Sequence, residues 1–177
     1  RIETENSARI TARISSKLTT QSELSRKRTA RLFLKSNRQD RDISADEIKA
    51  DFSYRPTTPM EIALTSRFSL EEDRFYAEPT QITAYALAPR VNYSLTTKGR
   101  FRGELEWSYV ESTPKDRLIP FEMASGRSLG NSLRWDFRFD YRISQTIQAT
   151  FSYTGRNEPQ RNRTIHTGRA QVTAAFR

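Results

Sequence analysis

The chain has 177 residues, a mass of 20.6 kDa and a net charge of +9, with a pI near 10.2. It contains no cysteine, which excludes disulfide bonds, thiol catalysis and metal sites with cysteine ligands. No apolar run approaches the ~18 residues of a transmembrane helix, and the mean hydropathy is −0.79.

Nine segments alternate apolar and polar residues with a period of two, as a strand with one apolar face does. They are residues 8–18, 30–35, 48–55, 60–70, 85–95, 101–109, 133–143, 147–154 and 169–176. In the clearest segment, Leu133–Ile143, apolar or aromatic residues occupy every odd position and charged residues every even one. Strands of globular proteins average about 5–6 residues, whereas tilted strands that cross a bilayer need about 9–11. Because most of these segments keep their alternation for about 9–14 residues, their length favours a membrane.

The connections between these segments alternate between short and long. Short turns are expected near 20–22 and at 55–58, 96–100 and 144–146, where turn-forming residues gather. Long polar loops are expected at 36–47, 71–81, 111–132 and 155–168. The pattern predicts an antiparallel up-and-down sheet with all its long loops at one end.

With these features the chain resembles the C-terminal part of Gram-negative outer-membrane β-barrel proteins. The residues that carry the resemblance are Tyr153–Arg156, which lead into a polar loop, and the closing segment Gly168–Arg177 with the penultimate aromatic Phe176. The resemblance implies an all-β, antiparallel up-and-down transmembrane barrel in the outer membrane, with its short turns in the periplasm. It also implies contact with outer-membrane lipid and a last strand that the barrel-assembly machinery reads.

Nine strands are an odd number, whereas single-chain bacterial barrels normally have an even number. Either one strand is miscounted around Gln21–Arg28, or upstream strands or another protein subunit complete the sheet. We favour the second interpretation, in which residues 1–177 are a barrel domain or the C-terminal portion of a larger one. The chain shows no signal peptide, and we expect that segment to have been removed if the protein is exported.

The alternation assigns residues to two faces. Charged residues expected to face the interior are Arg9, Arg13, Lys17, Arg134, Asp136, Arg138, Asp140 and Arg142. Residues expected to face lipid or form aromatic girdles are Trp107, Tyr109, Trp135, Phe137, Phe139, Tyr141, Tyr153 and Phe176. A basic interior would attract anions. Because the charges along 134–142 alternate in sign, we favour an interior that largely neutralises itself by cross-strand pairing.

Other classes of protein show parts of the same pattern. A soluble or secreted antiparallel β protein could present its basic face to nucleic acid or to an anionic polysaccharide, and a fibre subunit could pair through its exposed sheet edges. Proteins that stack bases place aromatic and basic residues on the same face. Here the two kinds segregate onto opposite faces, which argues against nucleic acid.

No pattern in the sequence points to catalysis or to a cofactor. The single histidine, His166, could be imagined with Ser152 or Asp140 as a catalytic set, but a histidine beside a turn is usually solvated. The run Glu71–Asp73 lacks the spacing of a calcium loop. We therefore expect no enzyme, no metal and no cofactor.

One loop feature stands out. The loop 111–132 contains an apolar patch that could plug the interior or dock on a partner, formed by Leu118, Ile119, Pro120, Phe121 and Met123.

The expected function is an integral outer-membrane barrel with a structural, passive-transport or surface-assembly anchoring role.

Overall fold

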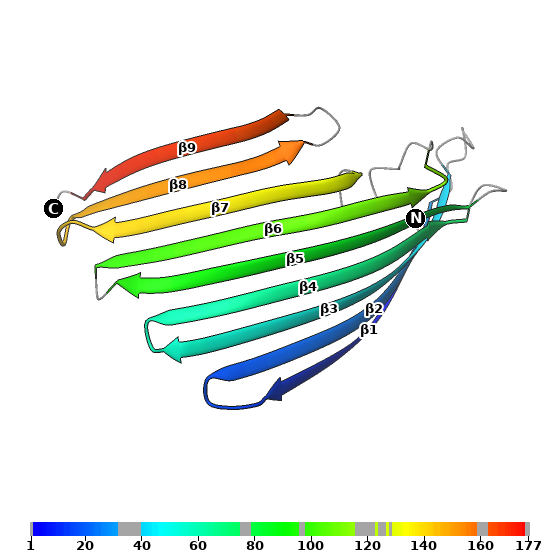
Figure 1. Ribbon diagram of the computed structural model, residues 1–177, viewed down its shortest axis with the longest axis horizontal. Helices are drawn as coiled ribbons and strands as arrows, with labels where there is room; N and C mark the ends of the chain where they lie inside the picture. Colours follow the sequence, from blue (N-terminus) through cyan, green and yellow to red (C-terminus); the bar gives the residue numbers. More distant parts are fainter. Residues whose placement is uncertain are drawn as a thin grey trace.

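The computed structural model describes residues 2–31, 40–74, 79–95, 98–115, 123, 127, 129–158 and 163–175. These form one antiparallel sheet of nine strands in which each strand pairs with its neighbours in the sequence (Figure 1). The strands are β1 (Ile2–Arg13), β2 (Leu18–Arg31), β3 (Arg41–Thr57), β4 (Met60–Asp73), β5 (Thr80–Leu95), β6 (Gly99–Thr113), β7 (Gly130–Arg142), β8 (Ile147–Glu158) and β9 (Arg163–Ala174). The predicted all-β, antiparallel up-and-down fold is confirmed.

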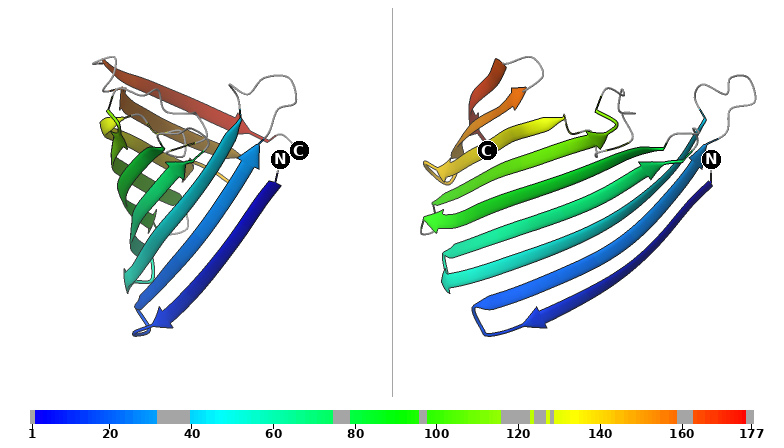
Figure 2. Two further views of the ribbon diagram at one scale, coloured as in Figure 1. Left: turned by 90° about the vertical axis from the view of Figure 1, so that its right-hand side faces the viewer. Right: turned by 45° about the vertical axis from the view of Figure 1, so that its right-hand side comes forward.

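The sheet is long, twisted and curled, and its two edges lie apart (Figures 1 and 2). Within the described residues the order begins at β1 and ends at β9, and these two strands do not pair with each other. Both run from the long-loop end of the sheet to the tight-turn end (Figure 1). The sheet is therefore an open wall.

No described segment is a helix long and apolar enough to cross a membrane.

The register fixes which side chains share a face. Leu87 lies opposite Trp107 and Tyr93 opposite Phe101, so apolar residues of neighbouring strands stand side by side. These residues lie on the face we call outward, where Leu87 and Trp107 remain 40% and 43% exposed. Their neighbours in sequence point to the other face, which we call inward. An apolar surface left exposed across the sheet needs an apolar solvent or a partner to cover it.

Two of the tight turns share one local structure. In the β1–β2 turn the Ser15 hydroxyl accepts hydrogen bonds from the backbone N–H groups of Lys17 and Leu18, at 3.2 and 3.1 Å. In the β7–β8 turn Ser144 accepts from Thr146 and Ile147 in the same way, at 3.2 and 3.1 Å. A serine hydroxyl that satisfies local N–H groups favours such a turn over continued strand.

The prediction for the first two strands is wrong in detail. The expected strand 8–18 crosses the β1–β2 turn, which lies at residues 14–17 and not near 20–22. The segment Gln21–Arg28 belongs to β2, and the expected strand 30–35 overlaps only its end. The outward positions of β2 include Thr20, Ser22 and Arg26, so this strand lacks the apolar alternation that marks the others.

The long loops are shorter than predicted because the strands continue beyond the apolar residues. On the outward face of β2 and β3, at the long-loop end, Arg26 pairs with Asp46 at 2.7 Å and Arg28 with Asp42 at 2.8 Å. Residues 41–47 and 155–158, which were expected to lie in loops, belong to β3 and β8. Outside a bilayer a strand needs backbone pairing but not apolar side chains, and cross-strand ion pairs suit that environment.

Aromatic residues cluster on the outward face where β7, β8 and β9 meet. Phe137 and Tyr153 stack with ring centroids 6.5 Å apart, and the Tyr153 hydroxyl lies 2.7 Å from the His166 Nδ1. The indole ring of Trp135 covers Gly155, so a Cβ at position 155 would overlap the ring. Gly155 is thus required by the close approach of Trp135 on the neighbouring strand.

We predict that Gly155→Ala lowers the free energy of unfolding by about 1–3 kcal/mol, the usual cost of overpacking. The change forces Trp135 off the sheet, which urea unfolding followed by tryptophan fluorescence in a Trp107→Phe background can measure. Gly168→Ala on β9 is the matched control, because no atom lies within 4 Å of a Cβ placed there. Equal stability of the two variants would contradict the packing described for Trp135.

Candidate functional site

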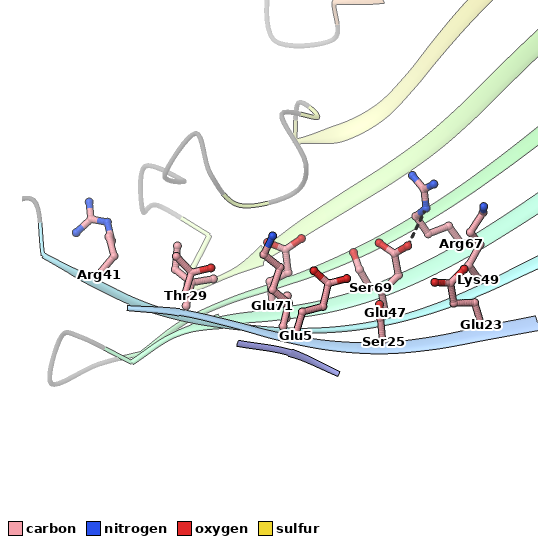
Figure 3. Close-up of a pocket in the computed structure, with 13 residues that line it drawn as sticks. Glu5, Glu23, Ser25, Thr29, Arg41, Glu47, Lys49, Arg67, Ser69 and Glu71 are labelled. Atoms are coloured by element: carbon pink, nitrogen blue, oxygen red, sulfur yellow. Dashed lines mark ion pairs between the residues drawn. The ribbon is translucent and has the colours of Figure 1, made fainter. Parts of the chain in front are cut away.

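The inward face carries the polar surface that a function can use. Over β1–β4 it forms a hollow of about 600 Å³, lined by acidic, basic and small polar side chains (Figure 3). Glu5, Glu23 and Glu47 come from three successive strands and share this surface with Lys49 and Arg67. The sequence positions them there because each occupies the parity opposite to the outward apolar residues.

Ion pairs link the strands across this hollow and at its borders. Arg67 Nε lies 3.2 Å from Glu47 Oε1 on the neighbouring strand, as Figure 3 shows. Further inward pairs between neighbouring strands include Arg9–Glu23 (2.9 Å), Arg55–Glu61 (2.7 Å), Arg41–Asp73 (3.5 Å) and Lys27–Glu3, and Lys49 pairs with Asp51 within β3 at 3.0 Å. Each partly exposed pair contributes about 0–1 kcal/mol. Together they give a polar wall of nearly balanced charge.

Near the long-loop end, part of the inward face is apolar. Ile43, Ile82, Ala84 and Val110, from β3, β5 and β6, form a cluster on which Met123 of the β6–β7 connection packs, 1% exposed. Four residues farther along the connection, Arg127 lies 3.3 Å from the inward Glu106. These two contacts hold described parts of the connection against the inward wall.

The predicted interior residues occupy the inward face with one exception. Arg9 and Arg13 on β1 do so, as do the five alternating charged residues of β7, namely Arg134, Asp136, Arg138, Asp140 and Arg142. Lys17, in contrast, lies in the β1–β2 turn, where its Nζ donates to the Pro56 carbonyl at 3.1 Å. The prediction for Lys17 fails because the turn comes earlier than expected.

The predicted girdle residues lie on the outward face, in cross-strand register from β6 to β8. They are Trp107, Tyr109, Trp135, Phe137, Phe139, Tyr141 and Tyr153. Phe176 lies outside the described residues, as do Leu118, Ile119, Pro120 and Phe121 of the apolar loop patch.

The residues considered for catalysis do not converge. His166 and Tyr153 point outward, whereas Ser152 and Asp140 occupy inward positions. The acidic run also splits between faces: Glu71 and Asp73 are buried on the inward side, and Glu72 pairs with Arg74 at 2.6 Å. Among the described residues, no group of three histidine or acidic side chains could hold a metal ion.

The inward apolar cluster is the feature that sequence reasoning missed. Ile43 and Val110 fell in or beside expected loops, and Ile82 occupies a position where the alternation calls for a polar residue. A usable signal existed, because Ile43, Ile82 and Val110 are large apolar residues at inward parity near the long-loop ends of their strands.

Solved structures with a similar fold include outer-membrane proteins. OmpT of Vibrio cholerae, in its trimer form, matches with a TM-score of 0.65 and 11% identity, over 96% of this chain and 54% of its own. A loop L8 deletion mutant of that OmpT gives 0.67 and 10% identity, over 97% of this chain and 53% of its own. The ferric-catecholate import receptor Fiu of E. coli K12 gives 0.59 and 10% identity, over 96% and 38%.

These matches show the fold of the chain and how much of the matched proteins' length it covers. The chain has the fold of Gram-negative outer-membrane β-barrel proteins, as predicted, and it spans about half the length of the Vibrio cholerae protein. No protein-family model matches the chain, and no curated protein sequence matches it.

Two substitutions on β8 test the assignment of faces. Phe151→Arg places a cation on the outward face and should lower the free energy of unfolding in lipid by about 2–4 kcal/mol. Thr154→Arg is the matched control, because Thr154 faces inward directly opposite Asp136 of β7, so an arginine there can pair with that carboxylate. Urea unfolding of vesicle-inserted protein measures both. Equal destabilisation would refute the two-faced wall.

Proposed function

We propose that this chain forms part of the wall of an outer-membrane barrel that lets small polar solutes pass passively through its interior. The observation that carries the proposal is the division of most strands into an outward apolar face and an inward polar face that is rich in ion pairs over β1–β4. An apolar exterior suits lipid hydrocarbon, and a polar wall around a 600 Å³ hollow suits water and dissolved solutes. A soluble protein would leave the outward band unexplained.

The open edges support completion of the sheet by further strands. In a bilayer an unpaired strand edge leaves N–H and C=O groups without partners, each at a cost of several kcal/mol. Because β1 and β9 run in the same direction, an odd number of additional strands gives antiparallel pairing at both edges. The same protein or another subunit could supply these strands, and either source gives the even total usual for such barrels.

The β6–β7 connection is the proposed constriction. Met123 is buried in the inward apolar cluster, and Arg127, 13% exposed, reaches Glu106 on the wall. Met123 and Arg127, held against the inner wall at these two points, would narrow the passage. A purely anchoring role, the alternative among barrel functions, gives no reason for Met123 and Arg127 to pack against the interior.

Release of this connection should widen the passage. Met123→Asp combined with Arg127→Gln removes both contacts, because a carboxylate is costly in an apolar cluster and the ion pair to Glu106 is lost. We expect a clear rise in single-channel conductance in planar bilayers. Lys115→Gln, an exposed change in the same connection, is the control and should leave conductance unchanged.

If neither the original protein nor the double variant conducts, passive transport is refuted and an anchoring role takes its place. Heat-modifiability separates this outcome from a wrong fold. A closed barrel from outer membranes should migrate differently on SDS gels before and after boiling. A soluble protein with no shift would refute the membrane interpretation as well.

A further inference from the structure

A second hollow lies on the inward face at the opposite end of the sheet, beside the tight turns. It has a volume of about 340 Å³ and lies over β6–β8 and the turn before β6. Its charged lining residues are Lys98, Arg100, Arg138, Asp140 and Arg142. Four cations thus face one carboxylate, in contrast to the balanced wall of β1–β4.

The single carboxylate is already engaged. Arg138 Nε lies 2.9 Å from Asp140 Oδ2, and Thr150 donates to Oδ1 of the same side chain at 2.8 Å. Arg100, opposite Asp140 in the register, also acts on it electrostatically. Within the described part of the chain, the side chains of Lys98 and Arg142 form no ion pair.

The register adds a further like-charge contact beside the hollow. Arg102 of β6 lies directly opposite Arg138 of β7, and its only described polar contact is with Asn92 at 3.3 Å. Like charges placed opposite each other across a sheet destabilise it. An anion bound beside Arg138 would reduce that repulsion.

We propose that this hollow is a binding site for small multivalent oxyanions such as phosphates. Guanidinium groups present forked N–H donors that match phosphate and carboxylate oxygens. Arg100, Arg138 and Arg142 are all exposed to the interior, so a dissolved anion can reach them without rearrangement of the sheet. The volume suits a small anion and not a polymer. The site rests on the proposed function in one respect only: the face on which it lies is taken to be the interior of the barrel.

Isothermal titration with inorganic pyrophosphate tests the site on the full protein, purified in mild detergent from whichever cell fraction contains it. Arg100→Gln with Arg142→Gln should weaken binding by about tenfold or more, because two charge-assisted donors are lost. Lys17→Gln with Arg55→Gln is the matched control. It removes the same charge at the same end of the sheet, where Lys17 contacts Pro56 and Arg55 pairs with Glu61.

The control should bind as the original protein does, and circular dichroism should show the same sheet content in all three proteins. Three results would overturn the site: no pyrophosphate binding by the folded original protein, equal affinity in all three, or equal loss in both double variants. The last would mean that net charge alone attracts the anion. Intact binding in a protein that forms no channel would refute the transport proposal and leave the site in place.

Discussion

Lipid hydrocarbon offers no hydrogen-bond partners, so every backbone N–H and C=O group in the bilayer must be satisfied within the sheet. Antiparallel pairing from β1 to β9 meets this demand across the wall, and the tight turns keep neighbouring strands adjacent. Once the backbone is paired, the two-residue period of a strand directs each side chain to one of two faces, toward lipid or toward the interior. Residues as different as Phe151 and Thr150 therefore lie side by side in the chain and on opposite faces of the wall.

The interior itself is divided by charge. Over β1–β4 most basic side chains have an acidic partner on the same or a neighbouring strand, as Arg67 has Glu47 and Arg9 has Glu23. Over β6 and β7, near the tight turns, arginines outnumber acids and Arg102 faces Arg138. At the other end the apolar cluster of Ile82 and Val110 receives Met123. A solute moving through the proposed passage would meet an apolar contact point first and a basic surface last.

Sequence alternation predicted the strands from β4 to β8 because their outward residues must be apolar to match lipid. It failed on β2, where Thr20, Ser22 and Arg26 occupy outward positions and backbone pairing alone defines the strand. The β1–β2 turn could have been predicted from the sequence, because Ile14–Leu18 has the same pattern as the β7–β8 turn Ile143–Ile147. In both segments the second residue is the serine whose hydroxyl accepts the local N–H groups. The ion pair between Arg127 and Glu106 could not have been predicted, because the sequence around one arginine in a long connection does not indicate which carboxylate it contacts.

The most direct test of the two-faced wall uses the absence of native cysteine. Single cysteines placed at consecutive positions from 148 to 153 on β8 are labelled in isolated outer membranes with a water-soluble and with a lipid-soluble maleimide. The structure predicts strict alternation: even positions react with the water-soluble reagent, and odd positions react only with the lipid-soluble one. Uniform reaction with the water-soluble reagent along the strand would contradict the transmembrane wall.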